Sequence, residues 1–474
     1  MKQPIRAAVL IVLLCLSGTP ANASEGLDGA SMQWPWILPF GGILLSIAAG
    51  PSLFPKVWHA HYGKLALIWG LLTIVPLAVV HGVPTARAAL LHTMVSEYVG
   101  FILLLLALYT TAGGILVTGS VNGNPWNNAA ILGAGTLSAS LIGTTGAAML
   151  FIRPLIAANE LRAHKAHVIV FFIILVANIG GALTPIGDPP LLIGFLHDID
   201  FFWPARHIWL QTVIVSAMVL GIFLALDFWH YGKEQGVERA TGEPLRVRGL
   251  VNLALLALIV CVILVSSKWK NAPAADLYGT HVGLQNVLRD VALGLIALAS
   301  LWLSSDEHRA SNGFSWEPMR EVAVLFACIF VAIIPVRAML EAGPNGSFAF
   351  LLNAVTGNDG LPHEAAYFWL TGALSAFLDN APTYLVFFEL AGGDAKQLMG
   401  PLAGTLASIS MGAVYMGALT YIGNAPNLMV YAIAQDRGIR MPDFFSYMLW
   451  AAAILVPIFL LLTALPIPPI LKLW

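Results

Sequence analysis

Two carboxylates lie where an apolar chain interrupts its own helical pattern. Asp188 lies in residues 178–192, NIGGALTPIGDPPLL, inside an apolar run from about 168 to 196, and Asp379 lies in residues 378–383, LDNAPT. The prolines and glycines around Asp188 are incompatible with one unbroken helix. In a bilayer, broken backbone survives only where protein buries it or where it lines a watery cavity. An ionisable group at such depth therefore indicates a functional site.

The segment around Asp188 occurs twice. Residues 181–190 read GALTPIGDPP and residues 417–426 read GALTYIGNAP, with seven of ten positions identical. Upstream, at closely matched spacing, residues 137–143 read LSASLIG and residues 374–380 read LSAFLDN. We interpret the two pairs as an internal duplication in which each half carries one re-entrant hairpin with a polar tip and one broken helix. This pattern is typical of the binding site of a secondary transporter.

The polar residues of these segments are candidate ligands for a hard cation. Carboxylate, amide, hydroxyl and backbone oxygens suit Na⁺, and a buried carboxylate can exchange a proton for that cation. Free N–H groups at helix N-termini and carbonyls of unwound backbone add further ligands. The candidate ion- or substrate-binding residues are Asp188, Asp379, Asn380, Asn178, Thr184, Thr420, Asn424, Thr144, Thr145, Thr383 and Asn427. Asp188 and Asp379, one from each half, are the candidate ligands of a transported sodium ion.

Each candidate also has a structural interpretation. Asp188 could cap the broken helix without binding an ion, whereas Asp379 and Asn380 are costly to bury at an apolar tip without a function. Lone threonines in membrane helices, such as Thr184 and Thr420, usually bond the preceding turn.

Other polar residues also have two interpretations. Asn178 and Asn427 could serve only helix packing. Arg153 could attract an anionic substrate, but a loop-end arginine that snorkels to the interface is the favoured interpretation.

Several further polar residues receive no functional assignment. His59 and His61, in WHAHY, are expected in a short interfacial loop rather than a metal site. A last group of charged residues is expected near the ends of spans, where a charged side chain reaches water at little cost in free energy: Glu97, Asp227, Arg337 and Glu389.

Composition indicates a polytopic membrane protein. The 474 residues are 58% hydrophobic and 10% charged, with mean hydropathy +0.81, whereas soluble domains are about one quarter charged. The net charge of −2 and the lack of a basic patch give no support for a nucleic-acid partner. Three scattered cysteines exclude a disulfide or zinc framework.

No HExxH or GxSxG signature occurs, so we expect neither an enzyme nor a resident cofactor, only a transported or coupling sodium ion and proton.

The chain divides into a leader and two similar halves. Residues 1–23 have the pattern of a cleavable signal peptide, with an uncleaved short anchor as the alternative. The two inverted repeats are expected at 35–230 and 250–470, joined by a charged cytoplasmic connector at 231–249. The expected segments are spans at 35–53, 65–82 and 94–118, a hairpin at 128–157, a broken span at 168–196 and a span at 208–230, then spans at 250–267, 287–303 and 321–342, a hairpin at 366–390, a broken span at 402–435 and a span at 444–470. The prediction is an all-α fold with about ten full crossings, two re-entrant hairpins and two broken helices.

Basic residues in short loops predict the orientation. With a periplasmic N-terminus, a loop with Lys56 and Lys64 is cytoplasmic, as are the loops around Arg162 and Arg437 and the connector. Lys268 is an exception, because it lies in a loop expected on the opposite face. The first hairpin then enters from the cytoplasm and the second from the periplasm.

The motifs NIGGALTPIGDPP, SAFLDNAPTYL and GALTYIGNAPN resemble the hairpin and broken-helix signatures of the ion transporter superfamily. That group includes NhaD-type sodium/proton antiporters, citrate and dicarboxylate carriers, and arsenite permeases, and the likeness covers about residues 35–470. It implies inverted repeats, a scaffold part, a mobile transport part and often a homodimer. It also implies roles for Asn178, Thr184 and Asp188 in the first broken helix. In the second half it implies roles for Asp379 and Asn380 in the hairpin and for Thr420 and Asn424 in the broken helix.

The first hairpin tip departs from the antiporter pattern. Antiporters of this type tend to carry an acid–amide pair there, and carboxylate carriers Ser-Asn-Thr, whereas this chain has Gly143, Thr144 and Thr145. The sequence therefore predicts a secondary active transporter of the bacterial inner membrane, exchanging Na⁺ or Li⁺ for H⁺ by alternating access. The alternative is a cation-coupled carrier of citrate or another small carboxylate. The expected partners are the lipid bilayer and these small solutes.

Overall fold

The structure, a computed structural model, describes residues 27–464 except 119–121, 235–245, 270–273, 278–279, 313 and 358–359. The predicted signal peptide and most of the predicted connector lie outside the described residues. Helices make up nearly all of the described chain, and two antiparallel strand pairs are the only strands there. The predicted all-α polytopic membrane fold is confirmed.

Eight helical segments of the described chain are long and apolar enough to cross a bilayer. They are α2 (Leu38–Leu53, preceded by η2, Trp34–Ile37), α3 (Pro55–His81), α4 with η3 and α5 (Val83–His92, Thr93–Tyr98, Val99–Gly113), α11 (Trp209–Tyr231), α12 (Leu250–Lys268), α13 (Leu284–Leu303), α15 (Glu317–Glu341) and α22 (Phe444–Ala464). The remaining membrane segments are the two hairpins and the two broken helices. The hairpins are α6–α7 (Pro125–Ile142, Thr144–Ala158) and α17–α18 (Glu364–Phe377, Asn380–Leu390). The broken helices are α8–η4–α9 (Ala166–Leu175, Ile179–Gly181, Pro189–Leu196) and α20–η6–α21 (Ala403–Met416, Gly417–Leu419, Ala425–Asp436). The eight long segments and two broken helices account for the ten predicted crossings.

Short elements connect these segments. The strand pairs are β1 (Leu116–Thr118) with β2 (Arg246–Arg248), in which Val117 opposes Val247, and β3 (Ala274–Leu277) with β4 (Thr280–Gly283). The short helices are η1 (Gly29–Ser31), α10 (Trp203–His207), α14 (Asp306–Ser311), η5 (Gly343–Asn345), α16 (Ala349–Val355) and α19 (Ala395–Met399).

The predicted loop with Lys56 and Lys64 is wrong. Helix α3 begins ten residues earlier than expected, at Pro55, so both lysines and both histidines of WHAHY are helical. A proline at the first helical position favours that start, because its missing N–H would have no partner there. Trp58 is buried, and its indole N–H donates to Glu321 of α15 at 2.6 Å.

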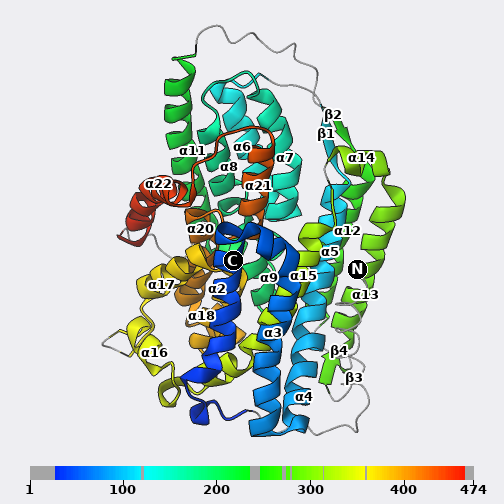
Figure 1. The fold of residues 1–474 in the computed structure, drawn as a ribbon, viewed down its shortest axis with the longest axis vertical. Coiled ribbons are helices and arrows are strands. Elements are labelled where there is room, and N and C mark those ends of the chain that lie inside the picture. Colours follow the sequence, from blue (N-terminus) through cyan, green and yellow to red (C-terminus); the bar gives the residue numbers. More distant parts are fainter. Residues whose placement is uncertain are drawn as a thin grey trace.

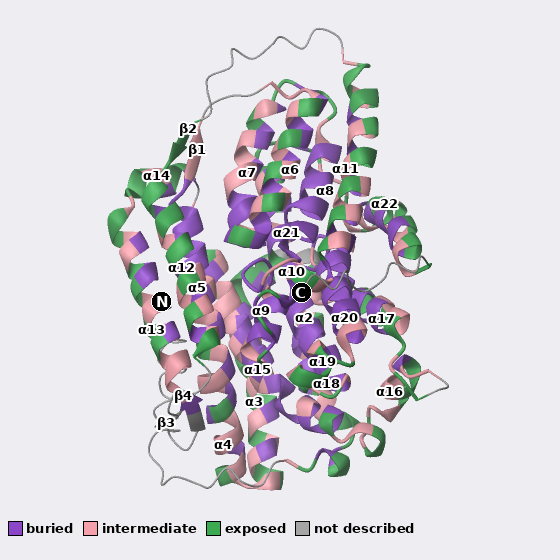
Figure 2. Cartoon of the chain, turned by 180° about the vertical axis from the view of Figure 1, so that it is seen from behind, coloured by how far each residue is buried: buried purple, intermediate pink, exposed green. Residues whose placement is uncertain are grey.

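The helices form two groups. The scaffold group consists of α2–α5, α12, α13 and α15, and the hairpin group consists of α6–α9, α11, α17, α18 and α20–α22. Figure 2 shows buried residues concentrated in the middle of the molecule, in α8, α9 and α20, and exposed ones along α12, α13 and α22. Every residue of α18 is buried. The main contacts between the groups are α7 on α5 and α18 on α15.

The two hairpins enter from opposite ends of the molecule. Figure 1 shows α6 and α7 in its upper half and α17 and α18 in its lower half. Their second helices, α7 and α18, begin near the centre, where both contact the start of α9. This is the inverted arrangement that the duplication predicted.

This arrangement predicts opposite exposure for the outer ends of α11 and α18. In a variant without native cysteines, we expect Lys233→Cys to react with a membrane-impermeant thiol reagent only from the cytoplasmic face. We expect Asp394→Cys to react only from the other face, because each site is exposed at one end of the molecule. Labelling of oriented vesicles measures this, and reaction of both cysteines from one face would contradict the inverted arrangement.

Candidate functional site

The carboxylate of Asp188 lies at the centre of the molecule and is almost fully buried. Three side chains from other elements donate to it. Thr144 Oγ1 and Asn424 Nδ2 donate to Oδ1 at 2.9 and 3.0 Å, and Asn380 Nδ2 donates to Oδ2 at 2.5 Å. Hydrogen bonds to an ionised group are the strong ones, so this shell stabilises a charge that burial alone would penalise.

The same contacts bring four helix N-termini together. Thr144 is the first residue of α7 and Asn380 the first of α18, while Asp188 and Asn424 immediately precede α9 and α21. A helix N-terminus carries a partial positive charge, although prolines remove N–H groups from the first turns of α9, α18 and α21. The centre therefore favours anionic groups, although no basic side chain contacts Asp188 in the described chain.

The structure distinguishes the two predicted acids. Asp188 precedes α9, but its side chain makes no capping hydrogen bond and instead receives the three donors above. The capping interpretation of Asp188 is therefore wrong. Asp379 does cap a helix, because its Oδ1 accepts from the N–H of Ala381 at 3.1 Å at the start of α18. The structure gives Asp379 no hydrogen bond to Asp188.

Asparagines form a second layer behind Asp188. Asn178 Nδ2 donates to Asn427 Oδ1 at 2.7 Å, and Asn427 Nδ2 donates to the carbonyls of Gly417 and Thr420. Asn424 also donates to the carbonyl of Ala177 at 3.1 Å. These amides therefore bind the unwound backbone of one repeat to the other, which is more than helix packing alone.

The predicted threonines hold the breaks against the hairpins. The hydroxyl of Thr184 donates to the carbonyl of Ser140 in α6, and that of Thr420 donates to the carbonyl of Ala376 in α17. The expectation that they bond their own preceding turn is wrong, because the broken helices have no regular turn there. Thr383 lies outside this set, since its hydroxyl bonds back to the carbonyl of Asp379 at 3.0 Å.

The second glycine of each GALTxIG motif is required by close backbone approach. A Cβ at Gly187 would lie 2.1 Å from the carbonyl oxygen of Gly181, and one at Gly423 would lie 2.6 Å from that of Gly417. The carbonyl of Gly187 also accepts from the N–H of Thr144 at 2.8 Å. The break in the first half is thus compact and joined to the first hairpin tip.

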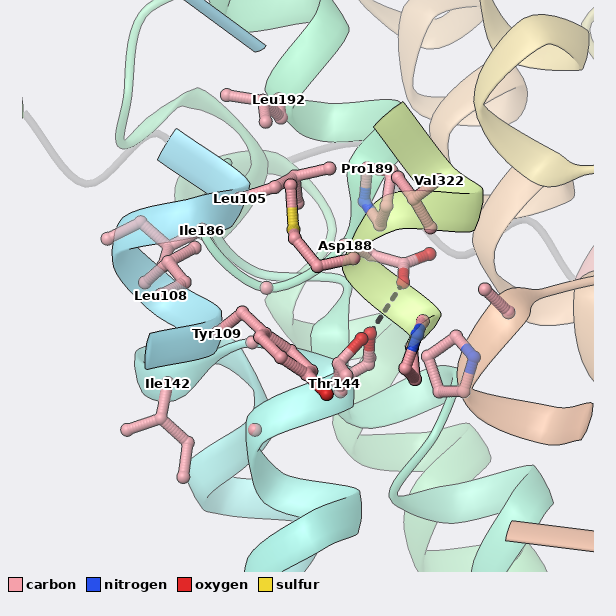
Figure 3. A pocket seen from close by; sticks show the side chains of 18 of the residues that line it. Leu105, Leu108, Tyr109, Ile142, Thr144, Ile186, Asp188, Pro189, Leu192 and Val322 are labelled. Atoms are coloured by element: carbon pink, nitrogen blue, oxygen red, sulfur yellow. Dashed lines mark hydrogen bonds between the residues drawn. The ribbon is translucent and has the colours of Figure 1, made fainter. Parts of the chain in front are cut away.

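A pocket lies beside Asp188, between the two helix groups (Figure 3). It offers about 100 Å³, which is room for several water molecules. Thr144, Thr145 and Asp188 supply its polar side, and Leu105, Leu108 and Tyr109 of α5 and Met319 of α15 much of its apolar wall. None of its described lining residues is basic. The pocket residues of α5 lie toward the end of that helix and those of α15 near its start, at the end of the molecule where α14 lies. We call this the α14 end.

Arg153 is not near either hairpin tip. Its Nη1 donates to the carbonyl of Ser311 in α14 at 2.9 Å.

The charged residues assigned to span ends are more buried than expected. Asp227 is fully buried and bonded to Arg162, His167 and Asn128. The span-end interpretation overlooked that such charges can pair with one another across helices.

Sequence reasoning missed part of the site. Ser140 Oγ donates to the carbonyl of Gly180 and accepts from the N–H of Leu183, so it fixes the break on the first hairpin. Its place in the duplicated LSASLIG segment was the available signal. The pocket walls from α5 and α15 carried no signal, because apolar residues in an apolar span look alike.

Residues 29–467 match a family described as "Putative citrate transport", and the chain belongs to this family. Two curated relatives, from Mycobacterium bovis and Mycobacterium tuberculosis, are each named an uncharacterized transporter. Each is 22% identical over 272 residues, which are 55% of this chain and 58% of the relative. The chain thus spans less than two thirds of the length of these relatives.

The threonine contacts predict a loss of stability on substitution. Thr184→Val removes one hydroxyl–carbonyl hydrogen bond, so we expect it to lower the free energy of unfolding by about 1 kcal/mol. Thr420→Val removes one such bond and also the acceptor of the Gly423 N–H, so we expect it to cost at least as much. Thr463→Val is the matched control, because Thr463 bonds only its own helix, to the carbonyl of Phe459. Thermal unfolding in detergent measures this, and equal effects at all three positions would contradict a special role for the two contacts.

Proposed function

We propose that this protein is a secondary active transporter of the bacterial inner membrane that couples a cation to the movement of citrate or a related small carboxylate. The observation that carries the proposal is the convergence of four helix N-termini, two from each repeat, on one buried carboxylate. The citrate class of substrate is suggested by the description of the family. The names of the two relatives indicate transport but specify no substrate.

The coupling cation is held at Asp188. Its carboxylate has hydroxyl and amide neighbours but no cationic side chain in the described structure, so a proton or Na⁺ is the natural counter-charge. Asn380 Oδ1 is buried and has no hydrogen-bond partner among the described residues, although its amide nitrogen donates to Asp188. An amide oxygen beside a carboxylate is a suitable Na⁺ ligand. Asp379, as a cap, stabilises α18 rather than the ion.

The carboxylate substrate is bound in the pocket next to the cation. Once a cation neutralises Asp188, the positive N-terminal end of α7 and the hydroxyl of Thr145 remain to attract an anion. Binding the cation first therefore lowers the electrostatic cost of bringing the anion in. This order couples the two solutes without an arginine at the site.

Sodium/proton antiport is the second candidate function. The position of Arg153, bonded to the carbonyl of Ser311 and away from the hairpin tips, favours it, because a multiply charged anion would benefit from a basic partner. On this alternative the pocket conducts the cation and the proton alternately to Asp188.

Transport by purified protein in proteoliposomes separates the two functions. We expect uptake of labelled citrate that requires an imposed H⁺ or Na⁺ gradient. In the same vesicles, a pH-sensitive dye reports proton movement when NaCl, LiCl or KCl is added without citrate. Cation-evoked proton movement without any citrate uptake would replace the carrier by the antiporter, and absence of both would contradict the proposed transport.

The two acids are expected to differ in this assay. Asp188→Asn should reduce transport to background, because an amide cannot bind a proton or neutralise a cation. Asp379→Asn should retain transport within about twofold, because Asn caps a helix as well as Asp does. Asp379→Ala serves as the capping control and should cost about 1 kcal/mol of stability. Loss of transport in Asp379→Asn, with the fold intact, would assign Asp379 to the ion site instead.

A further inference from the structure

A cluster of charged side chains joins the two helix groups at the end of the molecule away from the pocket. Arg337 of α15 pairs with Glu97 of η3 at 2.8 Å, with Glu341 of its own helix at 3.2 Å and with Glu389 of α18 at 2.9 Å. Glu97 and Glu389 are buried. His197, the residue that ends α9, points its Nε2 at Glu389 from 4.0 Å.

This cluster divides along the boundary between the groups. Arg337, Glu97 and Glu341 belong to the scaffold group, whereas Glu389 and His197 belong to the hairpin group. If α18 moves along α15, Arg337 keeps two carboxylates and Glu389 keeps the imidazole of His197. Breaking a buried ion pair is costly when it leaves one charge without compensation. Here Arg337 retains two carboxylates and Glu389 stays 4.0 Å from the imidazole of His197, so the Arg337–Glu389 contact can open and re-form.

The equivalent place in the first repeat is built differently. Arg153 is the tenth residue of α7 and Glu389 the tenth of α18, so each second hairpin helix carries one charge at the same level. Among the described residues Arg153 makes one hydrogen bond, to the carbonyl of Ser311, whereas the buried Glu389 pairs with the half-buried Arg337. The pocket lies on the Arg153 side, at the α14 end of α5 and α15. On the Glu389 side, all of α18 is buried.

We propose that the Arg337–Glu389 ion pair is a latch that holds the hairpin group against the scaffold group and closes the path from Asp188 to the face opposite the pocket. The latch forms when the site is accessible from the α14 end and opens when access changes to the other face. Glu97 holds Arg337 in place within the scaffold and is a positioning residue. The inference rests on transport by alternating access, as proposed above, but not on any particular substrate.

Thiol labelling of the protein in vesicles tests the latch without any substrate. Two reporters are placed separately in a variant without native cysteines. Met319→Cys lies in the pocket at the α14 end, and Val386→Cys is buried in α18, one turn from Glu389 toward its N-terminus. With the latch intact, Met319→Cys should react from the α14 face and Val386→Cys should be protected.

Opening the latch should change the labelling rates of the two reporters in opposite directions. Either Arg337→Ala or Glu389→Gln should raise the labelling rate of Val386→Cys from the opposite face by at least about fivefold, and lower that of Met319→Cys. The two substitutions combined should add nothing to Arg337→Ala alone, because that variant already lacks the contact that Glu389→Gln removes. Glu341→Gln is the matched control: it removes a carboxylate from the same arginine within α15, and it should leave both labelling rates unchanged.

Two results would overturn the proposal. One is continued protection of Val386→Cys in both latch variants while Met319→Cys still reacts, which would make the ion pair a packing contact. The other is faster labelling of both reporters from both faces, which would show general loosening rather than a change of access. Neither result depends on whether the protein carries citrate or exchanges cations, so a failure here is distinct from a failure of the proposed function.

Discussion

Burying the charge of Asp188 at the centre of the membrane domain is the constraint on which the rest of the site depends. An isolated carboxylate there would be too costly to keep ionised. The structure meets the cost with three hydrogen-bond donors and four helix N-termini, and each donor comes from a different element. Neither repeat could supply this environment by itself, because Thr144 comes from the first and Asn380 and Asn424 come from the second. The central charge therefore depends on donors from both repeats.

The sequence predicted the fold closely because the signals were local. Apolar runs gave the spans, and the duplicated GALTxIG motif located both breaks. Those motif residues are the ones with steric reasons to be fixed: the glycine at 187 passes close to the backbone at 181, and its counterpart at 423 repeats the contact. The start of α3 was missed because its first turn is rich in polar and aromatic residues, which resemble an interfacial loop.

The sequence predicted the members of the site better than their roles. Both acids were expected to bind the ion, but only Asp188 receives side chains from both repeats. Asp379 uses its carboxylate locally, as the acceptor for the N–H of Ala381 at the start of α18. Roles of this kind depend on side-chain direction across elements separated by some two hundred residues, which no local pattern reports. The duplication could place the two positions at the same depth but could not show that they differ chemically.

Chemical asymmetry between the repeats allows the two access states to differ in free energy. Position 188 carries an acid where position 424 carries an amide, and the second helix of one hairpin carries Arg153 where the other carries Glu389. If the halves were chemically identical, the two access states would have equal free energies and would be equally populated in the absence of solutes. On the proposed latch, the Arg337–Glu389 ion pair on one side and the Arg153–Ser311 hydrogen bond on the other would make the states unequal. Because binding at Asp188 involves the tips of both hairpins, the occupancy of that carboxylate can offset this inequality, which is the physical requirement for coupling a cation to the movement of a second solute.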